Sequence, residues 1–170
     1  MILATHALVG AAVAQIFPKY PLLGFVAAFL SHFILDAIPH DDYERESFIS
    51  DKNSPNDISK MDMVLGKKFI RDLIKISFDC IFGFAVALTF FSNSGLALQI
   101  AFIGAVGGVL PDALQFVYFK IKKEPLITLQ KFHKAIQHKL GNGIYRVGIL
   151  SQIVIVVIVF ILGIGRNFLR

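Results

Sequence analysis

The chain is poor in cysteine: it contains only Cys80, which lies inside an apolar stretch. One cysteine excludes an intrachain disulfide framework and a cysteine-based zinc site within a single chain. Cys80 is therefore interpreted as a packed side chain. The patterns GxxxxGK[ST] of a phosphate-binding loop and GxSxG of a nucleophile elbow are also missing, which disfavours P-loop chemistry and serine hydrolysis of the α/β-hydrolase type.

Lysine and arginine are absent from the residues that precede and form the first apolar stretch, 2–17. A secretory signal peptide begins with a positively charged segment. Although Ala12-Val13-Ala14 resembles a signal-peptidase site, we therefore expect this stretch to be a helix of the protein itself.

Hydrophobic residues are what the sequence has in excess. They make up 55% of its 170 residues, and the mean hydropathy is +0.67, whereas an ordinary soluble domain is about 45–50% apolar. They fall into five blocks: 2–17, 21–39, 69–91, 96–119 and 147–165. The first is short for a span of about 20 residues. The sequence predicts an all-α fold, with residues 1–170 forming one integral membrane bundle of about five transmembrane or membrane-embedded helices.

Two polar connections, 40–68 and 120–146, separate these blocks. The first is rich in Asp, Glu, Ser and Asn and is predicted to be a loop. The second contains an apolar stripe with helical spacing, formed by Leu129, Phe132, Ile136 and Leu140. We expect an amphipathic helix there, lying on the membrane surface or over the bundle, with His133 at the edge of its apolar stripe.

The net charge of +5 is better explained by membrane topology than by nucleic-acid binding, because the basic residues cluster at the ends of the apolar blocks. With five alternating crossings, one side of the membrane carries thirteen Lys and Arg residues and the other carries three. By the positive-inside rule, the N-terminus and both large loops are then cytoplasmic. Membrane lipid is the expected partner, no nucleic acid is expected, and homo-oligomerisation is left open.

Histidine and aspartate residues interrupt the apolar blocks, and this topology places them all near the cytoplasmic side. They are His6, His32, Asp36, His40, Asp79, Asp112 and His133. An unpaired charge at the centre of a bilayer costs at least about 2.5–3.5 kcal/mol on insertion scales. Gathered inside a bundle, these groups can neutralise one another, most simply by sharing a divalent cation.

The spacing of His32 and Asp36 supports a metal site. Residues four apart lie on one helix face, so both side chains can reach one ion. Pro39 ends the helix, which lets His40 turn back towards the same point. Imidazole and carboxylate are ligands of zinc, manganese and iron, and zinc is the first expectation.

Each of these residues also has a simpler interpretation. His6 can be a packed or interfacial histidine, and Asp79 can pair with Lys75 one helical turn earlier. Asp112 follows Pro111 and can cap a second half-helix. Gly104 and Gly108 have the small-xxx-small spacing that permits close helix packing.

Three segments carry a family resemblance: THALVG at 5–10, GFVAAFLSHFILDAIPH at 24–40 and GAVGGVLPDALQF at 104–116. They resemble the bacterial inner-membrane metal-dependent hydrolase group (YdjM-like), which is itself similar to helical zinc-dependent phospholipase C enzymes. The resemblance implies that His6 matches an N-terminal histidine of the group, and that His32 and Asp36 match its Ser-His-x-x-x-Asp pair. It also implies that Asp112 matches its Leu-Pro-Asp aspartate and that the protein resides in a bacterial inner membrane.

These observations lead to a first hypothesis of function: a membrane-embedded hydrolase of a phosphoester, such as a phospholipid or another anionic lipid-like substrate. In it, His6, His32, Asp36 and Asp112 hold the metal, and Asp79, His40 or His133 is a further ligand or the general base. A second hypothesis is ion or proton transport, although the polar groups do not extend across the whole bilayer. A third is a structural membrane protein in which the metal only holds the helices together, here called a structural staple. All coordination positions of such a metal are filled by the protein, whereas the metal of a hydrolase keeps one coordination position open.

Overall fold

The computed structural model describes residues 1–170 except 41, 43, 52, 55–56, 138–144 and 169–170. Over these residues the fold is all-α, as predicted, with one small hairpin and a short 3₁₀ turn at Ile58–Lys60. The elements are α1 (Leu3–Ala14), α2 (Pro21–Asp36), β1 (Phe48–Ile49), β2 (Asp62–Met63), α3 (Lys67–Phe91), α4 (Gly95–Ile121), α5 (Leu126–Ile136) and α6 (Tyr145–Phe168).

Several boundaries differ from the predicted ones. The second helix ends at Asp36, because proline disfavours helical geometry in the residue before it and Pro39 lies just beyond. The predicted loop 40–68 contains a two-stranded antiparallel hairpin in which Phe48 pairs with Met63. The predicted amphipathic helix is present as α5, while Leu140 lies outside the described residues.

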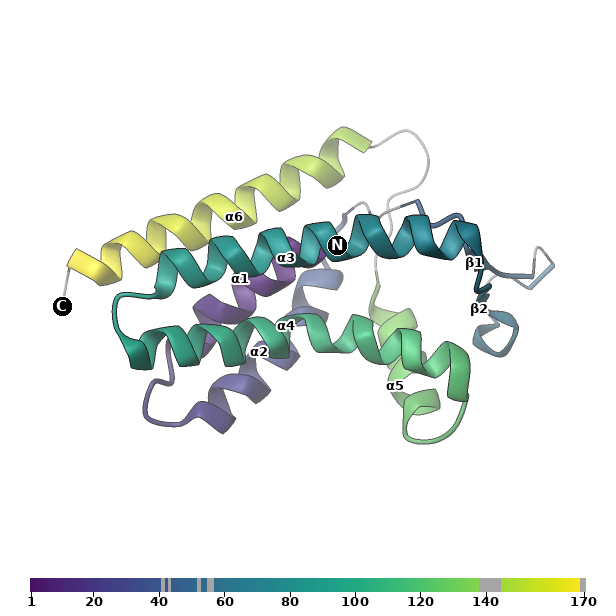
Figure 1. Cartoon of the computed structure of the whole chain (residues 1–170), viewed down its shortest axis with the longest axis horizontal. Coiled ribbons are helices and arrows are strands. Elements are labelled where there is room, and N and C mark those ends of the chain that lie inside the picture. Colours follow the sequence, from purple (N-terminus) through teal and green to yellow (C-terminus); the bar gives the residue numbers. More distant parts are fainter. Residues whose placement is uncertain (41, 43, 52, 55–56, 138–144, 169–170) are drawn as a thin grey trace.

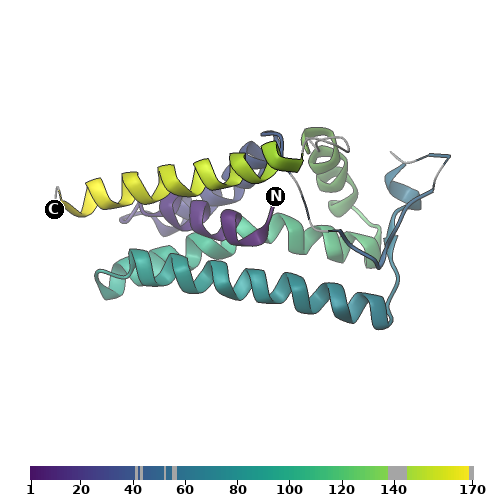
Figure 2. The same ribbon diagram turned by 90° about the horizontal axis from the view of Figure 1, so that it is seen from above.

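Helix α1 is the centre of the bundle. It packs against α2, α3, α4 and α6, and it lies between α6 and the α3–α4 pair (Figures 1 and 2). The α1–α4 contact is close because glycines line it. A methyl group at Gly104 would overlap the carbonyl oxygen of Gly10, and one at Gly108 would overlap that of His6. The predicted small-residue packing is confirmed.

The first turn of α1 is held by side chains from two other helices. Ala4 N donates a hydrogen bond to Asp79 Oδ2 of α3 at 2.9 Å, and Ile2 N donates to Gln152 Oε1 of α6 at 3.1 Å. Backbone N–H groups at a helix start have no partner within the helix, so these bonds satisfy them. They also fix the turn that carries His6.

The hairpin and α5 lie together at one end of α3 and α4, beyond the ends of the shorter helices (Figure 1). Lys120 Nζ donates to Asp62 Oδ1 at 2.8 Å, and Tyr118 Oη donates to the Ile58 carbonyl at 3.0 Å. The Lys120 contact lowers the pKa of the Asp62 carboxyl. These bonds dock the hairpin on the last turns of α4.

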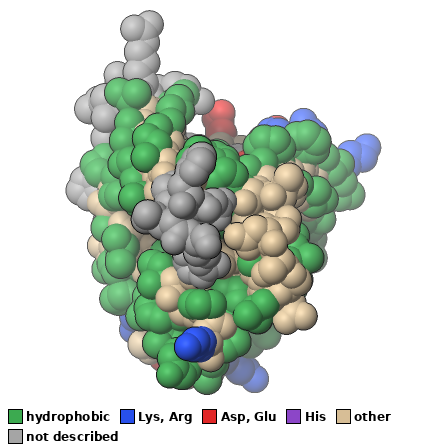
Figure 3. All heavy atoms as spheres, turned by 90° about the vertical axis from the view of Figure 1, so that its left-hand side faces the viewer, with side chains coloured by type: hydrophobic (Ala, Val, Ile, Leu, Met, Phe, Trp, Pro, Cys, Tyr) green, Lys and Arg blue, Asp and Glu red, His purple; other side chains and the backbone are tan. Residues whose placement is uncertain are grey.

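The surface of the helical region is strongly apolar. By length and composition, α3 and α4 can cross a membrane, and α1, α2 and Gly148–Ile164 of α6 are shorter apolar helices. The most apolar window of α3 has a mean hydropathy of 1.8, yet only 11% of it is buried. Seen from the end where α3 joins α4, hydrophobic side chains dominate the described surface (Figure 3). Two helices among the described residues are thus long and apolar enough to cross a membrane, and the five-span bundle stays a prediction.

Candidate metal centre

Asp36, in the last turn of α2, lies at the centre of a buried group of histidines. Its Oδ2 is 2.8 Å from His133 Nε2 and 3.3 Å from His32 Nε2. Its Oδ1 is 3.2 Å from His6 Nε2 and 3.3 Å from the Met1 amino nitrogen. All three histidines and Asp36 are at most 1% exposed. The structure therefore brings together residues from α1, α2 and α5 that are up to 127 positions apart in the sequence.

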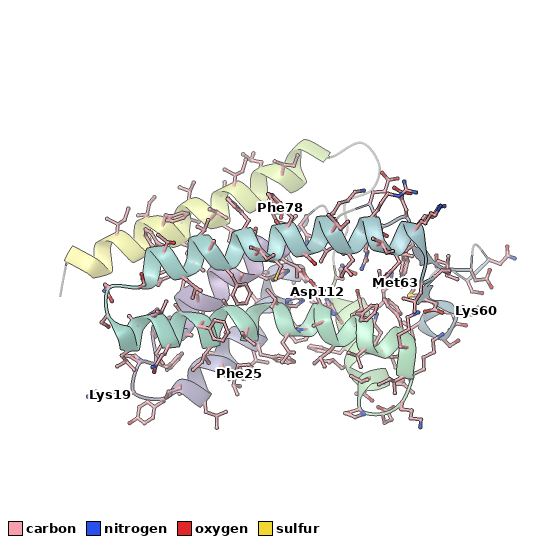
Figure 4. The ribbon with its side chains drawn as sticks, viewed as in Figure 1. Lys19, Phe25, Lys60, Met63, Phe78 and Asp112 are labelled. Atoms are coloured by element: carbon pink, nitrogen blue, oxygen red, sulfur yellow. The ribbon has the colours of Figure 1, made fainter. Side chains whose placement is uncertain are left out.

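Helices α2, α5 and α4 position the side chains of this group. Helix α2 places His32 and Asp36 one turn apart on one face. Helix α5 covers the bundle and buries His133, anchored by the edge-to-face contact of Phe132 with Phe33 at 5.0 Å between ring centroids. Helix α4 supplies Asp112, which lies in the middle of the molecule (Figure 4). Its Oδ1 is 3.8 Å from His32 Nε2 and 3.9 Å from His133 Nε2.

Three atoms of this group are close enough to bind one ion, namely His32 Nε2, His133 Nε2 and Asp36 Oδ2. The two Nε2 atoms are 3.3 Å apart. In a zinc tetrahedron with bonds of about 2.0–2.1 Å, ligand atoms are about 3.3–3.4 Å apart. The Asp36–His133 distance is shorter than this, and the distances from Asp112 Oδ1 to the two Nε2 atoms are longer, so Asp112 lies beside these three atoms.

The proton positions on two histidines favour a cation. His32 Nδ1 donates to the Gly108 carbonyl at 2.8 Å, and His40 Nδ1 donates to the Ile38 carbonyl at 2.7 Å. A neutral imidazole with its proton on Nδ1 has a lone pair on Nε2. The Nε2 lone pairs of His32 and His40 then face the carboxylate oxygens of Asp36, at 3.3 Å and 3.7 Å. A lone pair and a carboxylate repel each other, and a proton or a metal ion between them would remove that repulsion.

His6 is fully buried, and its Nδ1 has no hydrogen-bond partner among the described residues. Its Nε2 lies 3.2 Å from Asp36 Oδ1, without acceptable hydrogen-bond geometry. The His6 ring stacks on His32 with centroids 3.9 Å apart. A buried imidazole nitrogen without a hydrogen bond is costly, and a bound cation would satisfy one of the two His6 nitrogens.

Two sets of described residues could hold an ion: His6 with His32 and Asp112, and His32 with Asp36 and His133. They share His32, whose Nδ1 is committed to Gly108. Its Nε2 has one lone pair and can bind one ion. The two sets therefore describe one site rather than two.

The residues that the sequence predicted for the site thus divide into those that could bind the ion and those that lie near it. His6, His32, Asp36, Asp112 and His133 converge, with His133 placed among the ligands. His40 lies beside Asp36 Oδ1 but belongs to neither ligand set.

Asp79 belongs to neither ligand set, and its carboxylate accepts from the backbone of Ala4; its role as a further ligand or base stays a prediction. One interpretation drawn from the sequence needs correction. Asp112 does not cap a second half-helix, because α4 continues through Pro111. Gly95–Ile121 is one helix, so the side chain of Asp112 is available to the site.

Asp42 is a neighbour of the site that the sequence reasoning did not single out. Its Oδ1 lies 3.3 Å from His40 Nε2, and its Oδ2 accepts from Gln137 Nε2 at 2.8 Å. The acidic residues that directly follow His40 are the signal that could have identified it. Asp42 and Asp112 both line a cavity of about 280 Å³ next to the site, so the metal centre is connected to a space that could hold a ligand.

Comparison with known proteins found no matching family model, no matching curated protein and no matching solved structure.

Proposed function

We propose that this chain is a membrane-embedded, metal-dependent hydrolase of a phosphoester, with zinc as the first candidate metal and manganese or iron fitting the same donors. The observation that carries the proposal is a buried set of His32, His133 and Asp36 that could hold an ion, next to Asp112, which lines a cavity. A catalytic metal site needs an open position, and a purely structural site does not. The motif resemblance to the inner-membrane hydrolase group supports the same activity.

The proposed location is a bacterial inner membrane, with the site near the cytoplasmic face. Helix α3 supports it: a core helix of a soluble protein is mostly buried, whereas this one is apolar and largely exposed. In addition, basic residues gather at the end of α3 that lies near the hairpin, namely Lys67, Lys68 and Arg71. The proposed five-helix bundle uses the shorter apolar helices α1, α2 and Gly148–Ile164 of α6 as membrane-embedded elements beside α3 and α4.

The roles of the residues follow from their positions. His32, His133 and Asp36 hold the metal, and the Gly108 carbonyl fixes the His32 tautomer. A bound divalent ion would acidify a water molecule and polarise the phosphoryl group. Asp112 Oδ1, at the cavity, is placed to take the proton from that water. The water oxygen would then bond to phosphorus as the ester P–O bond breaks, and the leaving alkoxide would take the proton from Asp112 and depart as the alcohol.

The test is metal content followed by hydrolysis. The protein is purified in detergent without added metal, exposed to zinc or manganese, and analysed for bound metal. We expect near-stoichiometric metal in the wild type and in Asp72→Asn, whose buried carboxylate lies outside the site, but not in the double variant His32→Ala with Asp36→Ala. Absence of metal from the wild type would refute the proposal.

A structural staple is the second candidate, because the proposed ligands come from α2 and α5 and an ion would tie the short α5 to the bundle. Screening the metal-loaded protein against short- and long-chain phosphoesters separates the two functions. Hydrolysis that Asp112→Asn abolishes while metal remains bound supports the enzyme. Bound metal with no hydrolysis of any phosphoester supports the staple instead.

A further inference from the structure

The cavity next to the metal centre lies between α3 and α4, and its walls are mostly hydrocarbon. Phe69, Leu73 and Cys80 share one face of α3 by their spacing and line one wall. Phe116 of α4 stacks on Phe69 with ring centroids 5.6 Å apart and lines the other wall. Leu73 is 48% exposed and Phe116 is 37% exposed, so the cavity reaches the surface between the two helices.

This cavity also has polar lining residues. Asp42 and Asp112, which lie beside the candidate metal centre, line it together with Arg45 and Gln115. Arg45 is the one basic side chain among the described lining residues, and within the described part of the chain no carboxylate lies at ion-pair distance from it. A half-buried guanidinium without a carboxylate partner is suited to binding an anion, and phosphate fits its planar fork.

Arg45 is held in place rather than left mobile. Its Nη1 donates to Gln115 Oε1 at 3.3 Å, and its guanidinium lies 5.1 Å from the Phe48 ring centroid. The next two residues are bound to α3: Asp72 accepts from Glu46 N at 3.2 Å and from Ser47 N at 2.8 Å. The loop therefore presents the guanidinium to the cavity.

We propose that this cavity binds the hydrocarbon chain of a single-chain lipid phosphate ester. The phosphate of this lipid lies between Arg45 and the side of the candidate metal centre on which Asp112 is found. The assignment of this lipid as the substrate rests on the proposed function. A volume of about 280 Å³ is just below the usual range for ligand pockets, about 300–1,000 Å³, so the cavity has room for one chain and not two. The basic start of α3 lies where anionic head groups meet the membrane.

A photoreactive probe tests the proposal. Dodecyl phosphate with a diazirine on the chain is added to the full-length protein in phosphatidylcholine nanodiscs after chelator treatment, and cross-linked peptides are mapped by mass spectrometry. We expect labelling within 69–80 and 109–119, because the chain and Arg45 suffice for binding without metal. Excess unlabelled dodecyl phosphate suppresses it, and inorganic phosphate at the same concentration does not. Labelling confined to other segments, or lost equally to inorganic phosphate, would overturn the proposal.

Two pairs of variants locate the chain and the phosphate. Leu73→Trp fills the cavity and should lower labelling about tenfold, a change of about 1.4 kcal/mol, whereas Ile74→Trp, on the exposed face of α3, should not. Arg45→Gln should remove the preference for dodecyl phosphate over the matching dodecanol probe, and Arg71→Gln, an exposed arginine paired with Glu46, should keep it. Equal effects within either pair would contradict the assignment.

Metal content is measured on the same preparations, which separates the two proposals. Cavity labelling by a protein that never binds metal would refute the hydrolase and leave the lipid site standing. Bound zinc with no labelling in the cavity would refute the lipid site and leave the hydrolase standing.

Discussion

At the scale of residues, the candidate metal centre is organised around the carboxylate of Asp36, whose two oxygens contact different histidines. Asp36 Oδ2 faces His32 and His133, the proposed ligands, whereas Oδ1 faces His6 and His40. Because His6 and His40 contact Oδ1 and not Oδ2, they can orient Asp36 without binding the ion directly. Such outer contacts tune a metal site less than the ligands do.

This division predicts different effects for two histidines. His32→Ala removes a ligand and should abolish stoichiometric zinc binding. His40→Ala removes no proposed ligand, but it removes contacts to Asp36 Oδ1, Asp42 Oδ1 and the Ile38 carbonyl. It should weaken zinc binding by about 10- to 100-fold, as for other outer-sphere changes. Zinc affinity is measured by competition with a chromophoric chelator. Complete loss of zinc from His40→Ala would instead make His40 a direct ligand.

Much of the site could be predicted from the sequence because its histidines and aspartates interrupt apolar blocks, where unpaired charges are costly. The roles of Asp79 and Asp72 could not, because both carboxylates accept backbone hydrogen bonds from segments distant in sequence. A sequence marks an intramembrane aspartate as unusual. It does not show whether the partner is a histidine, a metal or the first turn of another helix.

At the scale of elements, the α1–α4 contact supports the metal centre. Gly108 permits the close approach of α1, and its carbonyl fixes the tautomer of His32. One residue therefore sets both the packing distance and the direction of a ligand's lone pair. The sequence predicted the close packing from the spacing of Gly104 and Gly108, but only the structure shows that His32 uses the Gly108 carbonyl.

Gly108→Ala should therefore impair stability and metal binding together. The added methyl group overlaps the His6 carbonyl, and overpacking of this kind costs about 1–3 kcal/mol. Thermal unfolding in detergent and zinc content are measured for the same sample. Gly95→Ala is the matched control, since its methyl group meets no atom within 4 Å. A Gly108→Ala protein with unchanged stability and zinc content would contradict this account of the contact.

Helix ends were harder to predict than helix positions. The second helix stops at Asp36 and not at 39, which places Asp36 in its last turn beside α5. Pro111 does not interrupt α4, although proline removes one backbone donor and crowds the carbonyl four residues earlier. Packing of α4 against α1 and α2 offsets that cost, and such tertiary contacts are not visible in local sequence.

At the scale of the whole molecule, charge and apolar surface divide the protein into two ends. The end with the hairpin and α5 carries most of the described basic residues, including Lys60, whereas Lys19 lies at the opposite end (Figure 4). The sequence predicted this division from the distribution of lysine and arginine. The sequence predicted less well which apolar helices are long enough to cross a membrane, since α1 and α2 are short.

The sidedness of the protein can be measured with single cysteines. In a Cys80→Ala background expressed in a bacterial host, Lys19→Cys should react with a membrane-impermeant maleimide in intact cells, because Lys19 is exposed at the end with few basic residues. Lys60→Cys, also exposed but at the basic end, should react only after the cells are lysed, because basic segments stay in the cytoplasm. Reaction of Lys60→Cys but not Lys19→Cys in intact cells would reverse the topology and place the metal centre near the outer face. Reaction of neither cysteine before lysis and of both after it would place the protein in the cytoplasm, where the exposed apolar face of α3 would need a protein partner instead of lipid.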